Sequence, residues 1–433
     1  MTVDPRTAPE VDAADVVGPE DELPPATPAV SFDSTPDNLR GYLQRWWQGI
    51  RAGELGSLPI IVGLIIIAIV FSTLDSTFYV ERNFTNLLLQ MAATATIGIG
   101  VVFVLLIGEI DLSVAFVSAV GGVTMTLLLR PDGAHWPWWA ALGLALIVTT
   151  TIGLVQALVI TKAGVPSFVV TLAGLLIWNG VVLILTTQYS TSGTIRIQDE
   201  TIVGIANDFL SDAAGWALVL IGVAAYAVVQ LQTARSRRSR GLDAKPLVVI
   251  VLQVVGLALV TGAAVWYANK DRGLPSVTVL VLALFLIWSF VASRTRFGRH
   301  VYAVGGNAEA ARRAGINVDR VRIMVFMIAG FMAGLGGVIL ASRLRSVATN
   351  TGGGDLLLNV IAAAVIGGTS LFGGRGRVVS ALLGALVIAS ISNGMGLLNL
   401  ATGTKFVITG LVLRAAVLVD SLSTRRRAAR GVV

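Results

Sequence analysis

The stretch RFGRHVYAVGGNAEAARRAGINVDRVR, which runs from Arg296 to Arg322, is a basic, water-compatible segment between two hydrophobic spans. Its middle predicts a helix of about two turns with both ends marked. Asn307 is a good N-cap residue, Glu309 places a negative charge in the first turn, and Gly315 can adopt the left-handed conformation that ends a helix. Start and stop signals this close together predict a separate short helix outside the spans.

The residues between the two caps are small or basic. Arg312 and Arg313 stand near the C-terminal end of the predicted helix, where cations suit the helix dipole. A short, smooth helix flanked by arginines just outside a membrane is suited to lie in a groove of another protein. Its small residues are Ala308, Ala311 and Gly315 on one face, with Ala310 and Ala314 beside them.

The composition of the chain is that of a membrane protein. Of the 433 residues, 55% are hydrophobic and 13% are charged, and the mean hydropathy is +0.80. In soluble proteins about 25% of residues are charged. The fold class is therefore all-α, a polytopic integral membrane protein with about 10–12 transmembrane helices, each near the ~20 residues that a bilayer needs. The hydrophobic spans lie near residues 58–74, 87–107, 114–129, 138–160, 168–185, 216–229, 247–267, 277–292, 321–340, 356–366, 378–391 and 407–419.

The net charge of +7 arises mainly from short basic clusters beside the hydrophobic spans. If the N-terminus lies inside, the dense clusters fall in cytoplasmic loops, as the positive-inside rule requires, and both termini are cytoplasmic. This distribution argues against a nucleic-acid partner. The chain has no cysteine, which excludes disulfides and thiolate chemistry. The clusters are Arg235–Arg240, Arg294–Arg322, Arg375 with Arg377, and Arg425–Arg430.

The chain divides into a polar N-terminal tail, a membrane domain and a basic C-terminal tail. Residues 1–57 are rich in proline and acidic residues, and we expect them to stay disordered in the cytoplasm because they cannot bury enough apolar surface to fold alone. The end of this tail, with Trp46 and Trp47, suits either an interfacial helix or a plain linker to the first span. Residues 58–420 form the membrane domain with its loop 294–322, and residues 421–433 form the C-terminal tail.

Three further passages accompany the Arg296–Arg322 segment. They are IGEIDLSVAFVSAVGG (Ile107 to Gly122), GVPSFVVTLAG (Gly164 to Gly174) and VIGGTSLFGGRGRVVSALLGALV (Val365 to Val387). The four passages together, in their order along the chain, resemble the permease subunits of bacterial ABC sugar importers of the ribose and xylose branch. The resemblance covers residues 83 to 420. The part between residues 187 and 294, which carries an extra pair of hydrophobic spans, is more similar to the xylose-type members.

The resemblance implies the fold of the type II importer permeases and a permease that translocates a monosaccharide, xylose or another pentose, in the bacterial inner membrane. It also implies three protein partners: a cytoplasmic ATPase that binds ATP and Mg²⁺, an extracytoplasmic sugar-binding protein, and a second copy of the permease. Membrane lipid surrounds the chain, which is expected to hold no cofactor, no metal and no catalytic residue. The coupling helix that contacts the ATPase corresponds to Asn307, Glu309, Ala310, Ala311, Arg312, Arg313 and Gly315.

Two acidic residues, Glu109 and Asp111, have hydrophobic spans immediately on both sides. Charges at membrane depth are costly and are usually functional, which favours a role in gating or in contact with a partner. At the cytoplasmic end of a span, however, an acid can cap a helix or contact an arginine loop at little cost. The structural role and the gating role therefore both stay open.

Asn179, beside Trp178 within a span, is the best candidate for a residue that contacts sugar in the pathway. An amide can bond hydroxyl groups, and an indole can stack on a sugar ring. Asn in membranes also bonds neighbouring helices, and that alternative stays open. Gln90, Gln156 and Asn359 are similar candidates for the pathway.

Glycine-rich turns interrupt the spans around Glu109–Ser113 and within Gly353–Gly376. Both stretches are expected to be broken or re-entrant. Ile107–Ser113 and Ile366–Phe372 also echo one another, as the halves of an inverted-repeat transporter would, although chance similarity between glycine-rich segments explains the echo almost as well. The GLGG run at Gly334–Gly337 predicts close packing between helices.

A secondary carrier or facilitator without an ATPase is the main alternative. No acid lies in the middle of a span, and Arg414 is the only base that does, whereas ion-coupled carriers normally hold an intramembrane carboxylate or relay. Such a carrier would leave the 307–315 helix without a purpose. A third class, an enzyme acting on lipid-linked sugar, would need acids that face a cavity. The chain has no phosphate-binding loop of the Walker type, and His135 and His300, both in loops by this pattern, are too few for a zinc site.

Overall fold

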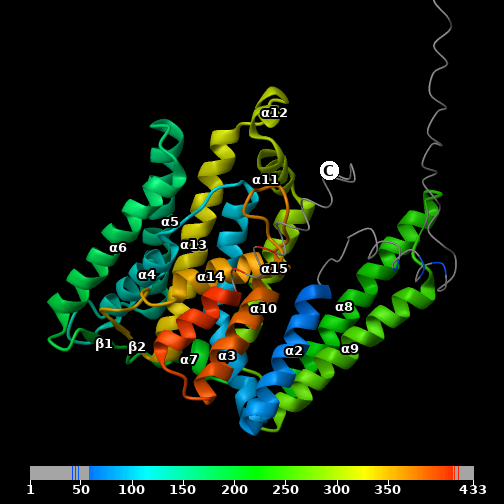
Figure 1. The fold of residues 1–433 in the computed structure, drawn as a ribbon, viewed down its shortest axis with the longest axis horizontal. Coiled ribbons are helices and arrows are strands. Elements are labelled where there is room, and N and C mark those ends of the chain that lie inside the picture. The colour runs from blue at the N-terminus through cyan, green and yellow to red at the C-terminus, as the bar shows by residue number, and fades with distance from the viewer. Residues whose placement is uncertain are drawn as a thin grey trace, which may run out of the picture.

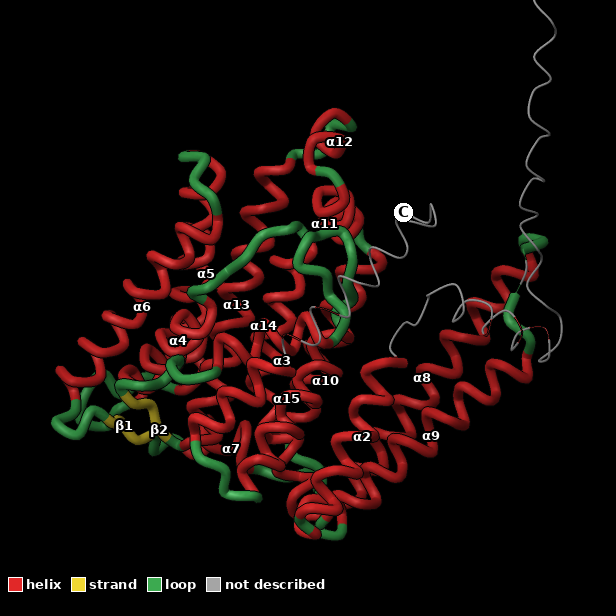
Figure 2. Tube along the Cα trace, in the orientation of Figure 1, coloured by secondary structure: helices red, strands yellow, loops and turns green. Residues whose placement is uncertain are grey.

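The computed structural model describes residues 58–242 and 244–412, with single helical positions at 41, 44, 47, 414 and 418. Within these residues the chain is a bundle of helices with one small pair of strands (Figures 1 and 2). Eight of the described helices are long and apolar enough to cross a membrane, and three shorter apolar helices accompany them. The prediction of an all-α polytopic membrane protein is confirmed.

The described helices follow the predicted spans closely. Each of the first eleven spans coincides with one apolar helix. The twelfth span, 407–419, begins within the helical residues 402–412, and its remainder lies largely outside the described residues. The predicted tails, 1–57 and 421–433, lie outside the described residues except at positions 41, 44 and 47. The apolar helices are α2 (Leu58–Leu74), α3 (Glu81–Leu106), α4 (Val114–Leu129), α5 (Trp138–Lys162), α6 (Ser167–Tyr189), α8 (Asp212–Ser239), α9 (Leu247–Asn269), α10 (Ser276–Arg294), α13 (Val318–Leu344), α14 (Leu356–Ile366) and α15 (Val379–Leu397).

Helix α13 lies at the centre of the bundle and packs against α3, α4 and α5 (Figure 1). Glycines allow this close approach, because a Cβ atom at Gly337 would overlap the carbonyl oxygen of Ser118, and one at Gly334 would overlap the hydroxyl of Thr149. Apolar helices gain no hydrophobic drive to associate within lipid, so close backbone packing takes its place. The predicted packing role of Gly334–Gly337 is confirmed.

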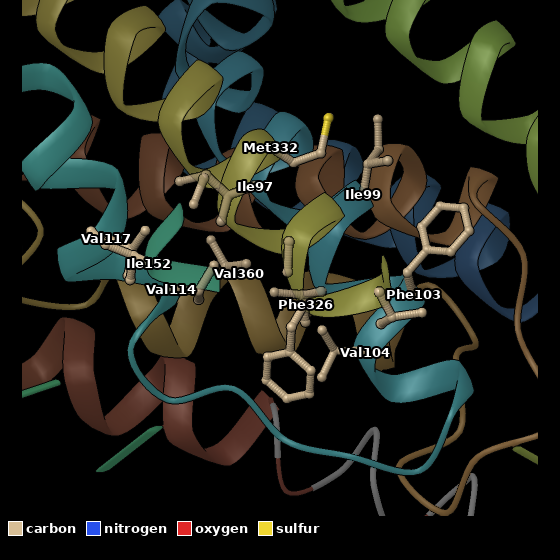
Figure 3. Close-up of a cluster of buried hydrophobic side chains, with 14 of the residues drawn as sticks. Ile97, Ile99, Phe103, Val104, Val114, Val117, Ile152, Phe326, Met332 and Val360 are labelled. Atoms are coloured by element: carbon tan, nitrogen blue, oxygen red, sulfur yellow. The ribbon is translucent and has the colours of Figure 1, made fainter. Parts of the chain in front are cut away.

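The buried core joins these central helices. Ile97, Ile99 and Phe103 of α3 pack in one cluster with Phe326 and Met332 of α13, and none of the five side chains is exposed (Figure 3). Few residues of α6 and α8 are buried in this chain. Their apolar side chains are therefore available to lipid or to another protein chain.

Dense arginine clusters mark one end of the bundle, which we call the arginine-rich end. It holds the α8–α9 turn, the loop 367–378 and two short helices, α11 (Arg296–Gly306) and α12 (Ala308–Arg313), that project from the bundle (Figure 1). Helix α12 matches the predicted short helix, whereas α11 is not among the predicted elements. Thr295 caps α11, since its Oγ1 accepts a hydrogen bond from the backbone N–H of Gly298 at 3.1 Å. His300, placed in a loop by the sequence pattern, therefore lies in a helix.

The opposite end of the bundle carries the two strands. Strand β1 (Thr194–Arg196) pairs antiparallel with β2 (Ser346–Ala348) (Figure 2). The buried residues Ile195 and Val347 are partners in this register. The short helices η1 (Ser76–Tyr79) and α7 (Glu200–Asn207) lie at the same end. None of these four elements is predicted by the sequence pattern.

Helices α8 and α9, the extra pair of spans, form a hairpin that leans away from the bundle toward the arginine-rich end (Figure 1). Side chains at the other end of this hairpin, just after α9, attach the hairpin to α3. Nζ of Lys270 lies 3.9 Å from the ring centroid of Trp266 and 3.7 Å from Oε1 of Glu81. The hydroxyl of Thr85, which is fully buried, donates a hydrogen bond to Oδ2 of Asp271 at 2.8 Å.

Candidate functional site

Helix α12 has the caps that the sequence predicts. Oδ1 of Asn307 accepts a hydrogen bond from the backbone N–H of Ala310 at 2.9 Å. Gly315 has a φ of 83°, in the left-handed region, and its N–H bonds the carbonyl oxygen of Arg312 at 3.0 Å. Residues next to the short helix therefore set both of its ends.

The charged side chains of α12 lie on its outer surface. The carboxylate of Glu309 contacts Nη1 of Arg312 at 3.2 Å and Nε of Arg313 at 3.4 Å, and all three side chains are more than half exposed. Of the predicted small face, Ala311 is buried and Ala308 is half-buried against the chain itself, whereas Gly315 is exposed. Ala308 and Ala311 are therefore not free for a partner. The exposed residues of α12 and its caps are Asn307, Glu309, Ala310, Arg312, Arg313, Ala314 and Gly315.

Two broken segments, 107–113 and 367–378, reach this end of the bundle beside α11. The predicted breaks are confirmed at Glu109–Ser113 and within Gly353–Gly376, where α14 lies between two non-helical segments. The backbone N–H of Gly374 donates to the carbonyl oxygen of Leu106 at 2.9 Å. The hydroxyl of Tyr302, on α11, donates to the carbonyl oxygen of Gly376 at 2.8 Å. Burial raises the pKa of the Tyr302 phenol, against a smaller opposing effect of Arg377. The phenol therefore stays a donor at neutral pH.

The acid Glu109 is tied to the start of α13. Its Oε1 lies 2.9 Å from Nη2 of Arg322, and the two side chains are 14% and 28% exposed. Asp111 is buried, and its Oδ1 accepts hydrogen bonds from the backbone N–H and the hydroxyl of Ser113, at 2.9 and 2.7 Å. Ser113 directly precedes α4. Glu109 thus contacts the arginine loop, and Asp111 lies at the start of a helix. Both contacts are the kind expected if the two acids have a structural role.

A cavity of about 590 Å³ lies between the turn at residues 108–110, the turn at residues 164–168 and the start of α13. Three of the four passages that carry the family resemblance therefore border one space at the arginine-rich end. The charged residues that line it are Glu109, Arg312, Asp319 and Arg322.

Asn179 and Trp178 point to different sides of α6, because successive residues of a helix are about 100° apart. Trp178 packs against the buried core, and its Nε1 has no hydrogen-bond partner among the described residues. Asn179 is exposed on the outer face of α6 and makes no hydrogen bond with the described part of the chain. The structure therefore does not bring the amide and the indole together.

The other amide candidates occupy separate places. Nε2 of Gln156 donates to Oγ of Ser113 at 2.9 Å, so this amide holds the start of α4 against α5. Asn359 of α14 is 9% exposed, and its Oδ1 has no partner among the described residues. Gln90 of α3 is half-buried. Sequence reasoning did not single out Ser113, Tyr302 or Arg322, because each depends on a contact with a distant segment.

Known proteins resemble this chain along most of its length. A family model described as "Branched-chain amino acid transport system / permease component" matches residues 83–418. The xylose transport system permease protein XylH of Escherichia coli (strain K12) is 36% identical over 386 residues, which are 88% of this chain and 95% of that protein. XylH of Haemophilus influenzae is 34% identical over 382 residues, with 86% of this chain and 98% of that protein covered.

A more distant relative is the ribose import permease protein RbsC of Escherichia coli (strain K12), which is 29% identical over 361 residues, 83% of this chain and 92% of that protein. No solved structure matches the chain. The broken segments, the capped helix α12 and the extra α8–α9 hairpin all fall within the matched residues. The chain therefore belongs to the family of branched-chain amino acid transport system permease components, and within it to the ribose- and xylose-type permeases.

Proposed function

We propose that this chain is the membrane permease subunit of an ABC importer that moves a monosaccharide into a bacterial cell with energy from a separate ATPase. The observation that carries the proposal is α12, a helix capped at both ends that projects from the bundle with Glu309, Ala310, Arg312 and Arg313 exposed. A facilitator would have no use for such a helix. Xylose is the first candidate substrate, because XylH, similar over 88% of this chain, is named for xylose transport.

The arginine-rich end faces the cytoplasm in this proposal, as the positive-inside rule requires. Helix α12 then meets the ATPase subunit, which binds ATP and Mg²⁺. The opposite end, with β1, β2 and α7, faces the sugar-binding protein outside the inner membrane. Both chain termini are cytoplasmic in this orientation.

Two copies of the chain form the pathway at their interface. The exposed face of α6 supports this arrangement, since it carries an amide, Asn179, among apolar side chains such as Leu176 and Leu183. A neutral sugar needs hydrogen bonds, and an amide supplies two donors and an acceptor without a fixed charge. The chain itself performs no catalysis, because it converts closure of the ATPase into alternating access by rigid movement of its helices.

Reconstitution tests the proposal directly. The permease, its ATPase and its binding protein are placed in proteoliposomes, and uptake of labelled xylose and ribose is measured with and without ATP. We expect xylose uptake that depends on both ATP and the binding protein. Equal uptake without ATP would favour the facilitator, whereas ATP-dependent uptake of ribose alone would correct only the sugar.

A further inference from the structure

Three segments that are far apart in the sequence meet backbone to backbone at the arginine-rich end. They are the end of α3, the end of α11 and the loop 367–378. A Cβ atom at Gly305 would overlap the carbonyl oxygen of Leu106, and one at Gly373 would lie 2.8 Å from the carbonyl oxygen of Gly305 and 2.9 Å from the nitrogen of Gly108. No side chain cushions these contacts. The three segments are therefore in direct backbone contact.

Side chains reinforce the same contact from both ends of α12. Tyr302, on the α11 side, donates its hydroxyl proton to the carbonyl oxygen of Gly376 in the loop 367–378. Arg322, on the α13 side, pairs with Glu109 in the segment 107–113 at 2.9 Å. The two helices that flank α12 thus each hold one broken segment, and α12 packs mainly against these two helices.

We propose that this junction, made of Gly108, Gly305, Gly373 and the Glu109–Arg322 pair, carries movement of α12 into both broken segments at once. The inference rests on the proposed function and identifies positioning residues for it. The segment 107–113 leads into α4, and the loop 367–378 joins α14 to α15. One displacement of α12 therefore reaches the short helices α4 and α14 together.

Neighbouring glycines provide the first test. Gly305→Ala places a methyl group against Leu106, whereas Gly306→Ala, one residue later in α11, places it where no atom lies within 4 Å. Sugar uptake per ATP hydrolysed is measured in the reconstituted complex for both variants. We expect a loss of roughly tenfold for Gly305→Ala, within the range seen for coupling residues, and the wild-type ratio for Gly306→Ala.

A charge exchange provides the second test and remains informative if Gly305→Ala fails to insert. Glu109→Arg and Arg322→Glu should each lower uptake per ATP by roughly tenfold. The double exchange should restore the ratio, because it rebuilds the ion pair in reverse. Arg238→Glu is the matched control, since it removes an exposed arginine from the same end of the bundle, on α8.

The outcomes separate this inference from the proposed function. If the wild-type complex does not move sugar with ATP, the proposed function fails. If the wild-type complex is coupled and the single charge variants keep its ratio, or the double exchange stays as low as the single variants, the junction is not the link and only this inference is overturned. A merely structural role would lower the amount of assembled complex and leave the ratio unchanged.

Discussion

Gly315 shows how one residue's backbone conformation supports the proposed contact with the ATPase. Its φ of 83° is unfavourable for residues with a Cβ, yet no atom lies within 4 Å of the place where a Cβ would stand. Backbone strain is therefore the main cost of a substitution, about 1–2 kcal/mol for a branched residue.

Gly315→Val should accordingly weaken binding of the ATPase roughly 5- to 30-fold. Gly315→Asn should keep most of the affinity, because asparagine tolerates the left-handed region. Titration of the ATPase onto the permease in detergent measures both constants. Equal binding by the two variants would show that the end of α12 has no part in docking.

Asn179 tests the residue that we place in the pathway. Asn179→Leu should lower uptake per assembled complex without lowering the amount of complex, because this exposed amide makes no hydrogen bond within the described chain. The matched control is Gln156→Leu, which removes the buried amide that donates to Oγ of Ser113 at 2.9 Å. That change should destabilise the fold by about 1–3 kcal/mol and lower the amount of complex instead. Unchanged uptake per complex in Asn179→Leu would remove Asn179 from the pathway.

Helices α12 and α13 carry the same kind of cap but depend on it differently. Asn307 caps α12 and Asn317 caps α13, each accepting a backbone N–H at 2.9 Å. Helix α12 has 6 residues, too few to form an independent helix in water, whereas α13 has 27 residues and the most central packing in the bundle.

Asn307→Ala, which costs about 1 kcal/mol of helix stability, should therefore unfold much of α12. Hydrogen exchange of residues 308–313 should rise, and the ATPase should bind more weakly. Asn317→Ala should leave exchange in the middle of α13 unchanged, because packing holds that helix. Protection of α12 in Asn307→Ala equal to that of the wild type would contradict this account.

At the scale of the whole molecule, the family match begins at residue 83 and leaves out the N-terminal tail. The tail is proline-rich and poor in large apolar residues, and we expect it to be dispensable for transport. Deletion of residues 2–36 should leave uptake within roughly twofold of the wild type. Loss of uptake with normal amounts of protein in the membrane would reveal a functional arm.

The sequence by itself determined the membrane class, eleven of the helical spans, the breaks at both glycine-rich turns and the two caps of α12. These features depend on local properties. Hydropathy over one helix length decides whether a segment can cross a bilayer, and a cap depends on residues within one turn of each other. The arginine clusters are also a local property of the sequence, and they predicted which turns lie at the same end of the bundle.

Only the tertiary structure decided which distant segments meet. It paired Ile195 with Val347, joined Glu109 to Arg322, and turned Trp178 inward while leaving Asn179 exposed. It also brought Gly305 and Gly373 together at the end of α3. Such contacts depend on how whole helices pack, because a residue's local sequence specifies its helix but not the neighbour that the helix will face.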